Sequence, residues 1–296
     1  MRAFITGGGG FVGHWLSTHL REQGDEVFSS DLEVDITDPL AVRAAIADVA
    51  PEAVYHLAAV SNVGESWDAP IKTFAVNAVG TLNVIEAVKA LATPPTVLLV
   101  CSSEVYGRVG PDELPLTEDA PLRPVSPYAA SKVSAEFLGL QAFLAHKLPV
   151  IRVRAFNHIG PGQAPSFVVA SLARQIVDAI AAGEPAVRAG NLTPERDFTD
   201  VRDVVRAYRL LVERGVPGEV YNVCSGESVA IEALARRMLA LASADLRLDV
   251  DPDRVRAVEM QVVRGDPSRL VAATGWAREY SLDRTLGDVL DSLRAK

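Results

Sequence analysis

A glycine-rich segment near the start of the chain constrains the fold more than any other feature. Residues 6–13 read TGGGGFVG, and they lie between a short apolar run and a stretch with helical spacing. Gly7, Gly10 and Gly13 have the spacing at which glycines permit a tight turn, a close approach of backbone to a pyrophosphate, and close packing of helix on strand. The N-terminus of the helix then presents the positive end of its dipole to the phosphates. The segment therefore predicts a strand–turn–helix unit that binds a dinucleotide.

The first half of the chain alternates short apolar runs with helical stretches. The expected strands are Arg2–Thr6, Glu26–Ser30, Ala53–Ala58, Thr96–Ser102 and Val150–Arg154. The expected helices are Phe11–Gln23, Pro39–Val49, Ile71–Leu91 and Pro127–His146. Such alternation predicts an α/β fold of the Rossmann type, a doubly wound parallel sheet with helices on both faces. The run TVLLV is apolar on both sides, as a strand covered on both faces requires.

The pattern changes after about Ala155, where Gly and Pro become frequent and the alternation weakens. We expect a dinucleotide-binding domain over residues 1–155 and a smaller mixed α/β domain over 156–296. A short apolar run at Val220–Val223 is expected to return to the first sheet. Further helices are predicted at Phe167–Ala182, Val201–Arg214, Ile231–Leu241 and Leu282–Leu293.

Charge and cysteine content narrow the class of protein. The 296 residues include 29 Lys or Arg and 38 Asp or Glu, a net charge of −9, which argues against a nucleic-acid or anionic-membrane partner. The two cysteines, Cys101 and Cys224, end apolar runs and fit buried thiols, and the sequence contains no Cys/His pattern for a metal. We find no signal peptide and no apolar run of membrane-spanning length, so we expect a cytoplasmic protein.

An acidic residue follows the second expected strand. Asp31 lies 18 residues after Gly13, close to the offset of a carboxylate that binds the adenosine ribose hydroxyls. A carboxylate there repels the 2′-phosphate of NADP, and the stretch 24–37 contains no Lys or Arg. The sequence therefore favours NAD(H), while NADP(H) stays open if Asp31 turns to solvent. Asp35 either holds the adenine amino group or is an acid at the start of a helix.

The segment 128–132 reads YAASK, with a tyrosine and a lysine four residues apart in an expected helix. This spacing places Tyr128 and Lys132 on one face. An ammonium near a phenol lowers the pKa of the phenol, which would make Tyr128 a general acid or base near neutral pH. Lys132 can also hold the nicotinamide ribose. The alternative is a surface pair.

The fourth expected strand ends at Ser102, and parallel strands open onto a ligand crevice at their carboxyl ends. A serine hydroxyl there can bond a substrate hydroxyl or ketone. If the chain stays extended, Glu104 lies on the same side as Ser102, and Cys101 and Ser103 point the other way. Glu104 is then either a base on a substrate carbon or a solvated loop acid.

Several motifs carry a resemblance to a known family. TGGGGFVG, HLAA (56–59), SSEVYG and YAASK resemble the extended short-chain dehydrogenase/reductase superfamily in its nucleotide-sugar branch. In the second half, RAFNHIGPGQ (154–163), GNLTPERDFTDVRDVVRAY (190–208) and VYNVCSG (220–226) resemble the GDP-mannose 4,6-dehydratases and the GDP-4-keto-6-deoxymannose reductases. The resemblance covers essentially the whole chain. HIGPGQ and RDFTDVRD are more similar to the reductases.

The resemblance implies roles for individual residues. It places Ser102, Tyr128 and Lys132 in a catalytic triad, and Glu104 where the dehydratases carry their base, although such reductases can also carry a glutamate there. The cofactor site it implies comprises Gly7, Gly10, Phe11, Val12, Gly13, Asp31, Asp35, Ile36, Leu57, Ala58, Ala59, Tyr128 and Lys132. The substrate site it implies comprises Ser102, Asn157, Arg188, Asn191, Arg196, Arg256 and Glu259. From residue type alone, such loop arginines are either diphosphate ligands or ordinary surface residues.

The activity implied is reduction of GDP-4-keto-6-deoxy-D-mannose at C4 to GDP-D-rhamnose, with a GDP-sugar as substrate and no metal. The alternatives are a GDP-mannose 4,6-dehydratase, a nucleotide-sugar 4-epimerase and a non-catalytic dinucleotide sensor. We interpret His56 and His158 as structural histidines. We also expect a homodimer that pairs the helices at Thr73–Leu91 and Pro127–His146.

Overall fold

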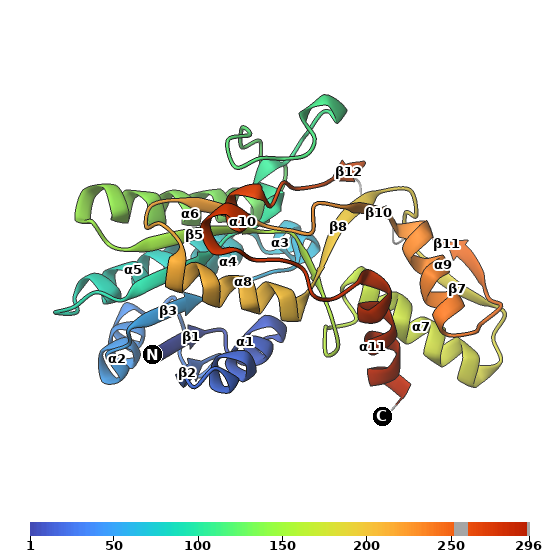
Figure 1. The fold of residues 1–296 in the computed structure, drawn as a ribbon, viewed down its shortest axis with the longest axis horizontal. Helices are drawn as coiled ribbons and strands as arrows, with labels where there is room; N and C mark the ends of the chain where they lie inside the picture. Colours follow the sequence, from blue (N-terminus) through green and yellow to red (C-terminus); the bar gives the residue numbers. More distant parts are fainter. Residues whose placement is uncertain (252–259, 295–296) are drawn as a thin grey trace.

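A six-stranded parallel sheet forms the centre of the computed structural model, which describes residues 1–251 and 260–294 (Figure 1). The strand order is β2-β1-β3-β4-β5-β9, so the chain starts inside the sheet and winds outward in both directions. This is the doubly wound α/β fold that the strand–helix alternation predicts. The strands are β1 (Arg2–Thr6), β2 (Glu26–Ser30), β3 (Ala53–His56), β4 (Thr96–Val100), β5 (Val150–Ala155) and β9 (Val220–Val223).

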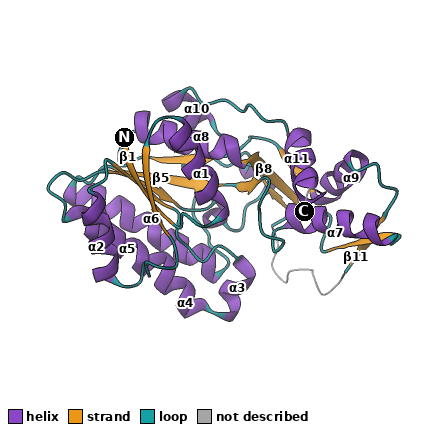
Figure 2. Cartoon of the chain, turned by 90° about the horizontal axis from the view of Figure 1, so that it is seen from below, coloured by secondary structure: helices purple, strands orange, loops and turns teal. Residues whose placement is uncertain are grey.

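Helices cover both faces of this sheet (Figure 2). One face packs against α1 (Phe11–Glu22), α8 (Val201–Arg214) and α10 (Ser268–Thr274). The other face packs against α2 (Pro39–Val49), α5 (Gly80–Lys89) and α6 (Pro127–His146).

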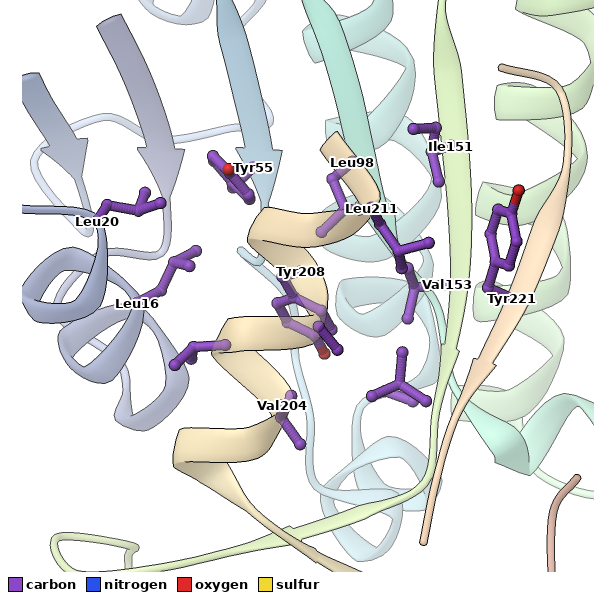
Figure 3. Packing of buried hydrophobic residues seen from close by; sticks show 14 of the residues in the cluster. Leu16, Leu20, Tyr55, Leu98, Ile151, Val153, Val204, Tyr208, Leu211 and Tyr221 are labelled. Carbon is purple, nitrogen blue, oxygen red and sulfur yellow. The ribbon is translucent and has the colours of Figure 1, made fainter. Parts of the chain in front are cut away.

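Strand alternation divides the core in the same way, because successive side chains point to opposite faces. Tyr55 and Leu98 face α8 and belong to the same core as its residue Leu211, as Figure 3 shows. The neighbouring Val54 and Val97 pack against the helices on the other face. The continuously apolar strands are therefore buried on both sides.

The helix starts follow from local capping chemistry. The Asp38 side chain accepts hydrogen bonds from the amides of Leu40 and Ala41 at 2.9 and 3.3 Å, which fixes the start of α2. Ser126 accepts from the Ala129 amide at 3.1 Å and starts α6, with Pro127 in its first turn.

The long helix expected at Ile71–Leu91 is interrupted in the structure. It consists of α4 (Pro70–Phe74), a π-helical turn (Ala75–Val79) and α5, and it is preceded by a short helix, α3 (Val63–Asp68). The residues Pro70–Lys89 are long and apolar enough to span a membrane, although the sequence analysis found no such run. Half of that stretch is buried in the fold, where α4 and α5 pack against α6, as expected of a core helix.

A second lobe is built on smaller sheets. β8 (Glu195–Asp200) pairs with β10 (Ser228–Ala230), β12 (Val262–Val263) and β6 (Asn157–Ile159), and β7 (Ala186–Ala189) pairs with β11 (Arg247–Val250). Three helices cover these sheets and share one apolar core, which is separate from the core of the central sheet. They are α7 (Val168–Ala182), α9 (Ile231–Leu241) and α11 (Leu282–Arg294).

Candidate active site

A large cleft opens where the carboxyl ends of β1, β3, β4 and β5 face the second lobe. Its volume is about 1420 Å³, above the roughly 300–1,000 Å³ that a single small ligand requires. The lining includes every predicted site residue that the structure describes: Gly7, Gly10, Phe11, Val12, Gly13, Asp31, Asp35, Ile36, Leu57, Ala58, Ala59, Ser102, Glu104, Tyr128, Lys132, Asn157, Arg188, Asn191 and Arg196. Arg256 and Glu259 lie outside the described residues.

The glycine turn has the geometry that a bound pyrophosphate requires. Gly7 adopts a left-handed backbone (φ +73°), and a Cβ there would lie 2.9 Å from the backbone of Ala58. A Cβ on Gly13 would overlap the Gly7 carbonyl, so only glycine lets α1 pack this closely on β1. The first turn of α1 lines the cleft, where its N–H groups can bind an anion.

Asp31 lies directly against this turn. A Cβ placed on Gly9 would overlap Oδ2 of Asp31, so the carboxylate sits at the edge of the predicted adenosine site. Glu33 accepts a hydrogen bond of 2.7 Å from the Asp31 amide. Asp35 accepts from the amide and the hydroxyl of Thr37 at 2.8 and 2.7 Å, which lowers the pKa of Asp35.

Tyr128 and Lys132 lie one turn apart on the buried face of α6. Burial raises the pKa of Tyr128, the charge of Glu104 adds to the rise, and a hydrogen bond with Ser102 opposes it. Lys132 donates from Nζ to the Val100 carbonyl at 2.9 Å, and burial lowers the pKa of its ammonium. The expectation that the pair lowers the pKa of the phenol is therefore wrong for this structure, because desolvation outweighs the favourable contacts.

The chain does not stay extended after Ser102, contrary to the assumption made from the sequence. Ser102 accepts a hydrogen bond of 3.2 Å from the Glu104 amide and caps a 3₁₀ turn over Ser103–Tyr106. The alternation argument therefore fails here, because a serine at this position can bond the backbone two residues ahead. Even so, Ser102 and Glu104 line the same cleft, as does Cys101.

Asn77 is a buried residue that supports the site from outside the cleft lining, and it was not predicted from the sequence. It lies in the π-helical turn, where its side chain bonds both backbone groups of Val60, at 2.8 and 3.1 Å, and the Ser131 hydroxyl at 2.9 Å. Ser131 donates to the Tyr128 carbonyl at 2.7 Å. An asparagine inside the apolar run FAVNAV was the available signal, because a buried amide must find partners.

The second lobe contributes polar groups opposite the glycine turn. Arg196 on β8 bonds the Glu195 carbonyl at 2.8 Å, and Asn191 accepts two bonds from Thr193, at 3.1 and 2.9 Å. Gln175 on α7 accepts from the Arg188 amide at 3.2 Å and also lines the cleft. The second lobe therefore places two arginines, Arg188 and Arg196, in the lining of the cleft, and both are hydrogen-bonded to neighbouring groups.

Two histidines near the site make structural contacts. His56 bonds the hydroxyls of Thr6 and Thr81 at 2.7 and 2.9 Å, and burial lowers its pKa to about 3. Nε2 of His158 lies 3.2 Å from the Tyr208 hydroxyl, and burial lowers the pKa of His158 to about 4. Over residues 1–251 and 260–294, no group of three His, Cys, Asp or Glu side chains is arranged to hold a metal.

Comparison with known proteins defines the family. The family profile described as GDP-mannose 4,6 dehydratase matches residues 30–289. A GDP-6-deoxy-D-mannose reductase from Pseudomonas aeruginosa is 38% identical over 299 residues, which span 100% of this chain and 98% of the relative. A GDP-mannose 4,6-dehydratase from Vibrio cholerae is 28% identical, over 87% of this chain and 77% of the relative.

Solved structures of nucleotide-sugar enzymes have the same fold as this chain. RMD from Pseudomonas aeruginosa complexed with NADPH superposes with a TM-score of 0.90 at 37% identity, over 99% of each chain. A UDP-glucose 4-epimerase from Thermotoga maritima with UDP-glucose gives 0.92 at 25% identity, over 100% of this chain and 99% of the other. The chain belongs to the GDP-mannose 4,6-dehydratase family within the extended short-chain dehydrogenase/reductases, and it is an NAD(P)-dependent nucleotide-sugar oxidoreductase.

Proposed function

We propose that the enzyme reduces the C4 ketone of GDP-4-keto-6-deoxy-D-mannose and forms GDP-D-rhamnose. The observation that carries this proposal is that Tyr128, Ser102 and Lys132 line one cleft, with Tyr128 hydrogen-bonded to Ser102. Ketone reduction needs a proton donor for the developing alkoxide, and the phenol of Tyr128 can supply that proton. The relative with 38% identity over the whole chain is named as a reductase of this type.

Each residue of the triad has one task in this mechanism. Bound NADH supplies the hydride for C4. The Ser102 hydroxyl orients the ketone oxygen, and Tyr128 donates its proton to that oxygen as negative charge develops. Lys132, held against the Val100 carbonyl at 2.9 Å, binds the ribose hydroxyls of the cofactor. Asn157 lines the same cleft and is proposed to contact the sugar.

The second lobe is proposed to bind the nucleoside diphosphate. The second lobe contributes Arg188, Asn191 and Arg196 to the lining of the cleft. Arginine forks match the oxygens of a diphosphate, and a cleft of about 1420 Å³ has room for a dinucleotide and a nucleotide sugar together. Guanine as the base follows from the names of the relatives.

We infer that NAD(H) is the preferred cofactor. Asp31 lies against Gly9, so a 2′-phosphate on the adenosine ribose would meet a carboxylate. The similar structure from Pseudomonas aeruginosa holds NADPH, so the NAD(H) preference proposed for the present chain rests on Asp31 alone.

A dehydratase activity is the second candidate, and Glu104 is the observation that favours it. Glu104 lines the same cleft as Tyr128 and its charge acts on Tyr128, so in this reaction its carboxylate is the candidate base for the C5 proton. In that reaction the cofactor is recycled, and Glu104→Gln abolishes loss of water while cofactor binding is kept. A 4-epimerase, the third candidate, also recycles its cofactor.

We further propose a cytoplasmic homodimer. Large apolar side chains are exposed on both segments expected to pair: in Thr73–Leu91, Val79 is 49% and Leu82 38% exposed, and on α6 Phe137 is 53% and Leu144 59% exposed. Such a concentration on two packed helices is typical of a protein–protein contact.

One experiment separates these activities. Purified enzyme is incubated with GDP-mannose and, separately, with GDP-4-keto-6-deoxymannose, each with and without NADH. The masses of the products are measured by mass spectrometry. The reductase gains two hydrogens on the keto-sugar only with NADH and leaves GDP-mannose unchanged. Loss of water from GDP-mannose without added reductant establishes the dehydratase instead. If neither substrate changes, the guanine assignment is wrong and UDP- and dTDP-sugars are tested next.

A further inference from the structure

The carboxylate of Asp197 is fully buried in β8, next in sequence to the cleft residue Arg196. Its Oδ1 atom accepts hydrogen bonds from the Ser225 amide and hydroxyl at 2.7 and 2.6 Å. Its Oδ2 atom accepts from the amides of Gly226 and Gly265 at 3.0 and 3.2 Å. All four donors are neutral, so the charge is balanced by aligned dipoles.

These donors come from the two chain segments that flank Arg196 in the sheet. The turn at 225–226 leads into β10, where Val229 pairs with Arg196. The other donor follows β12 directly, where Val263 pairs with Arg196 from the opposite side. Successive side chains of a strand point to opposite faces of the sheet. Arg196 therefore faces the cleft, and the Asp197 side chain, on the opposite face, bonds the segments next to both neighbouring strands.

The same contact continues into the first lobe. Gly265 forms a bridge with Leu116, and the Leu116 carbonyl accepts from the Asn222 side chain at 2.8 Å. Asn222 in turn accepts from the Tyr106 hydroxyl at 2.6 Å, and Tyr106 ends the 3₁₀ turn that contains Glu104. Asp197 therefore lies where the strand of Arg196 is joined to the turn beside the triad.

We propose that Asp197 is a positioning residue for the nucleoside diphosphate, whose carboxylate holds β10 and β12 so that Arg196 keeps its place in the cleft. The ligand in this statement rests on the proposed function. The four-donor arrangement requires a carboxylate, because both oxygens must accept. An asparagine amide has one accepting oxygen, and its other polar group is an NH₂ donor. That NH₂ group would face two of the four donors, which would then be buried without an acceptor.

The test compares two buried aspartates. Asp197→Asn keeps the shape and removes one acceptor. Asp203→Asn is the control, because Asp203 is equally buried and accepts hydrogen bonds from the amides of Glu279 and Tyr280 at 3.0 and 3.1 Å. It also pairs with Arg206 at 3.1 Å, and it lies on α8 outside the cleft lining. Dissociation constants for GDP and for NADH are measured by calorimetry, with the melting temperature of each variant alongside.

We expect Asp197→Asn to weaken GDP binding by at least about tenfold, with NADH affinity within about twofold of wild type. Asp203→Asn should lower the melting temperature but leave both affinities within about twofold. If Asp197→Asn does not fold, Ser225→Ala takes its place: it removes one of the four donors and should weaken GDP binding by about threefold.

Unchanged GDP affinity in Asp197→Asn, or in Ser225→Ala where that variant is used, overturns the proposal. An equal loss in Asp203→Asn also overturns it, because general loosening would then explain both. A wild-type enzyme that binds NADH but not GDP contradicts the proposed function itself, and the ligand assigned to Arg196 falls with it.

Discussion

Asn77 donates a hydrogen bond of 2.9 Å to the hydroxyl of Ser131 and so joins the π-helical turn to the helix that carries the reacting groups. Ser131 in turn donates to the Tyr128 carbonyl at 2.7 Å. The orientation of α6 toward the cleft is therefore fixed from the neighbouring helix as well as by its own N-cap. A π-helical turn at this place is consistent with the frequent use of such turns at functional sites.

Two serines of α6 test this contact as a matched pair. Each hydroxyl bonds a carbonyl of its own helix, Ser131 at 2.7 Å and Ser134 at 3.0 Å, but only Ser131 also accepts from Asn77. We expect Ser131→Ala to cost about 1–3 kcal/mol of unfolding free energy, since it leaves a buried amide donor unsatisfied, and to lower kcat. Ser134→Ala should change both by little. Equal effects in urea denaturation and turnover would show that the Asn77 contact is unimportant.

Cofactor choice tests the placement of Asp31. We expect wild-type enzyme to have a kcat/KM for NADH at least about tenfold above that for NADPH, because the carboxylate repels a 2′-phosphate. Asp31→Ser should raise kcat/KM for NADPH through a lower KM. Glu33→Gln is the control, since it removes a neighbouring charge and leaves Asp31 in place. A wild-type preference for NADPH would contradict this interpretation.

The sequence was sufficient for the strands of the central sheet and for most of the helices that cover it, because their signals are local. The glycine turn, the apolar strands and the caps at Asp38 and Ser126 each depend on residues close in sequence. The small strands of the second lobe were not predicted. β8 reads ERDFTD, which has no simple apolar alternation, and it is stabilised by partners far away in the chain.

The site shows the same limit. Residue types and spacing predicted that Tyr128, Lys132 and Ser102 lie in one site, and all three line the cleft. They did not show that desolvation controls the pKa of the phenol. That effect depends on burial by the whole fold. Asn77 and Asp197 were missed because their partners lie 54 and 28 to 68 residues away.

The proposed homodimer is tested on α6. Phe137→Glu places a charge on the exposed apolar face of that helix and should convert a dimer into a monomer in light scattering. Leu241→Glu is the control, because Leu241 is similarly exposed, at 43%, but lies on α9 in the second lobe. A wild-type monomer, or a dimer that survives Phe137→Glu, would contradict the proposed pairing.

His56 predicts a pH dependence of stability. Above pH 6.5 its ring is neutral in both the folded and the unfolded chain. Between pH 6.5 and about pH 3 the unfolded chain binds a proton at this histidine and the folded chain does not. The free energy of unfolding therefore decreases as the pH is lowered, by about 1.4 kcal/mol per pH unit from this group. Urea denaturation at pH 7 and pH 5 measures the slope. His56→Asn should reduce it, and an unchanged slope in His56→Asn argues against this assignment.

The most direct test of the central claim follows the hydride itself. The enzyme is given GDP-4-keto-6-deoxymannose and NADH deuterated at the transferable position, and the product is examined by NMR. The account predicts one deuterium at sugar C4, the D-rhamno configuration, and a loss of turnover of about 10²–10⁴-fold in Tyr128→Phe. Deuterium elsewhere in the sugar, none in the product, or near wild-type turnover in Tyr128→Phe would contradict it.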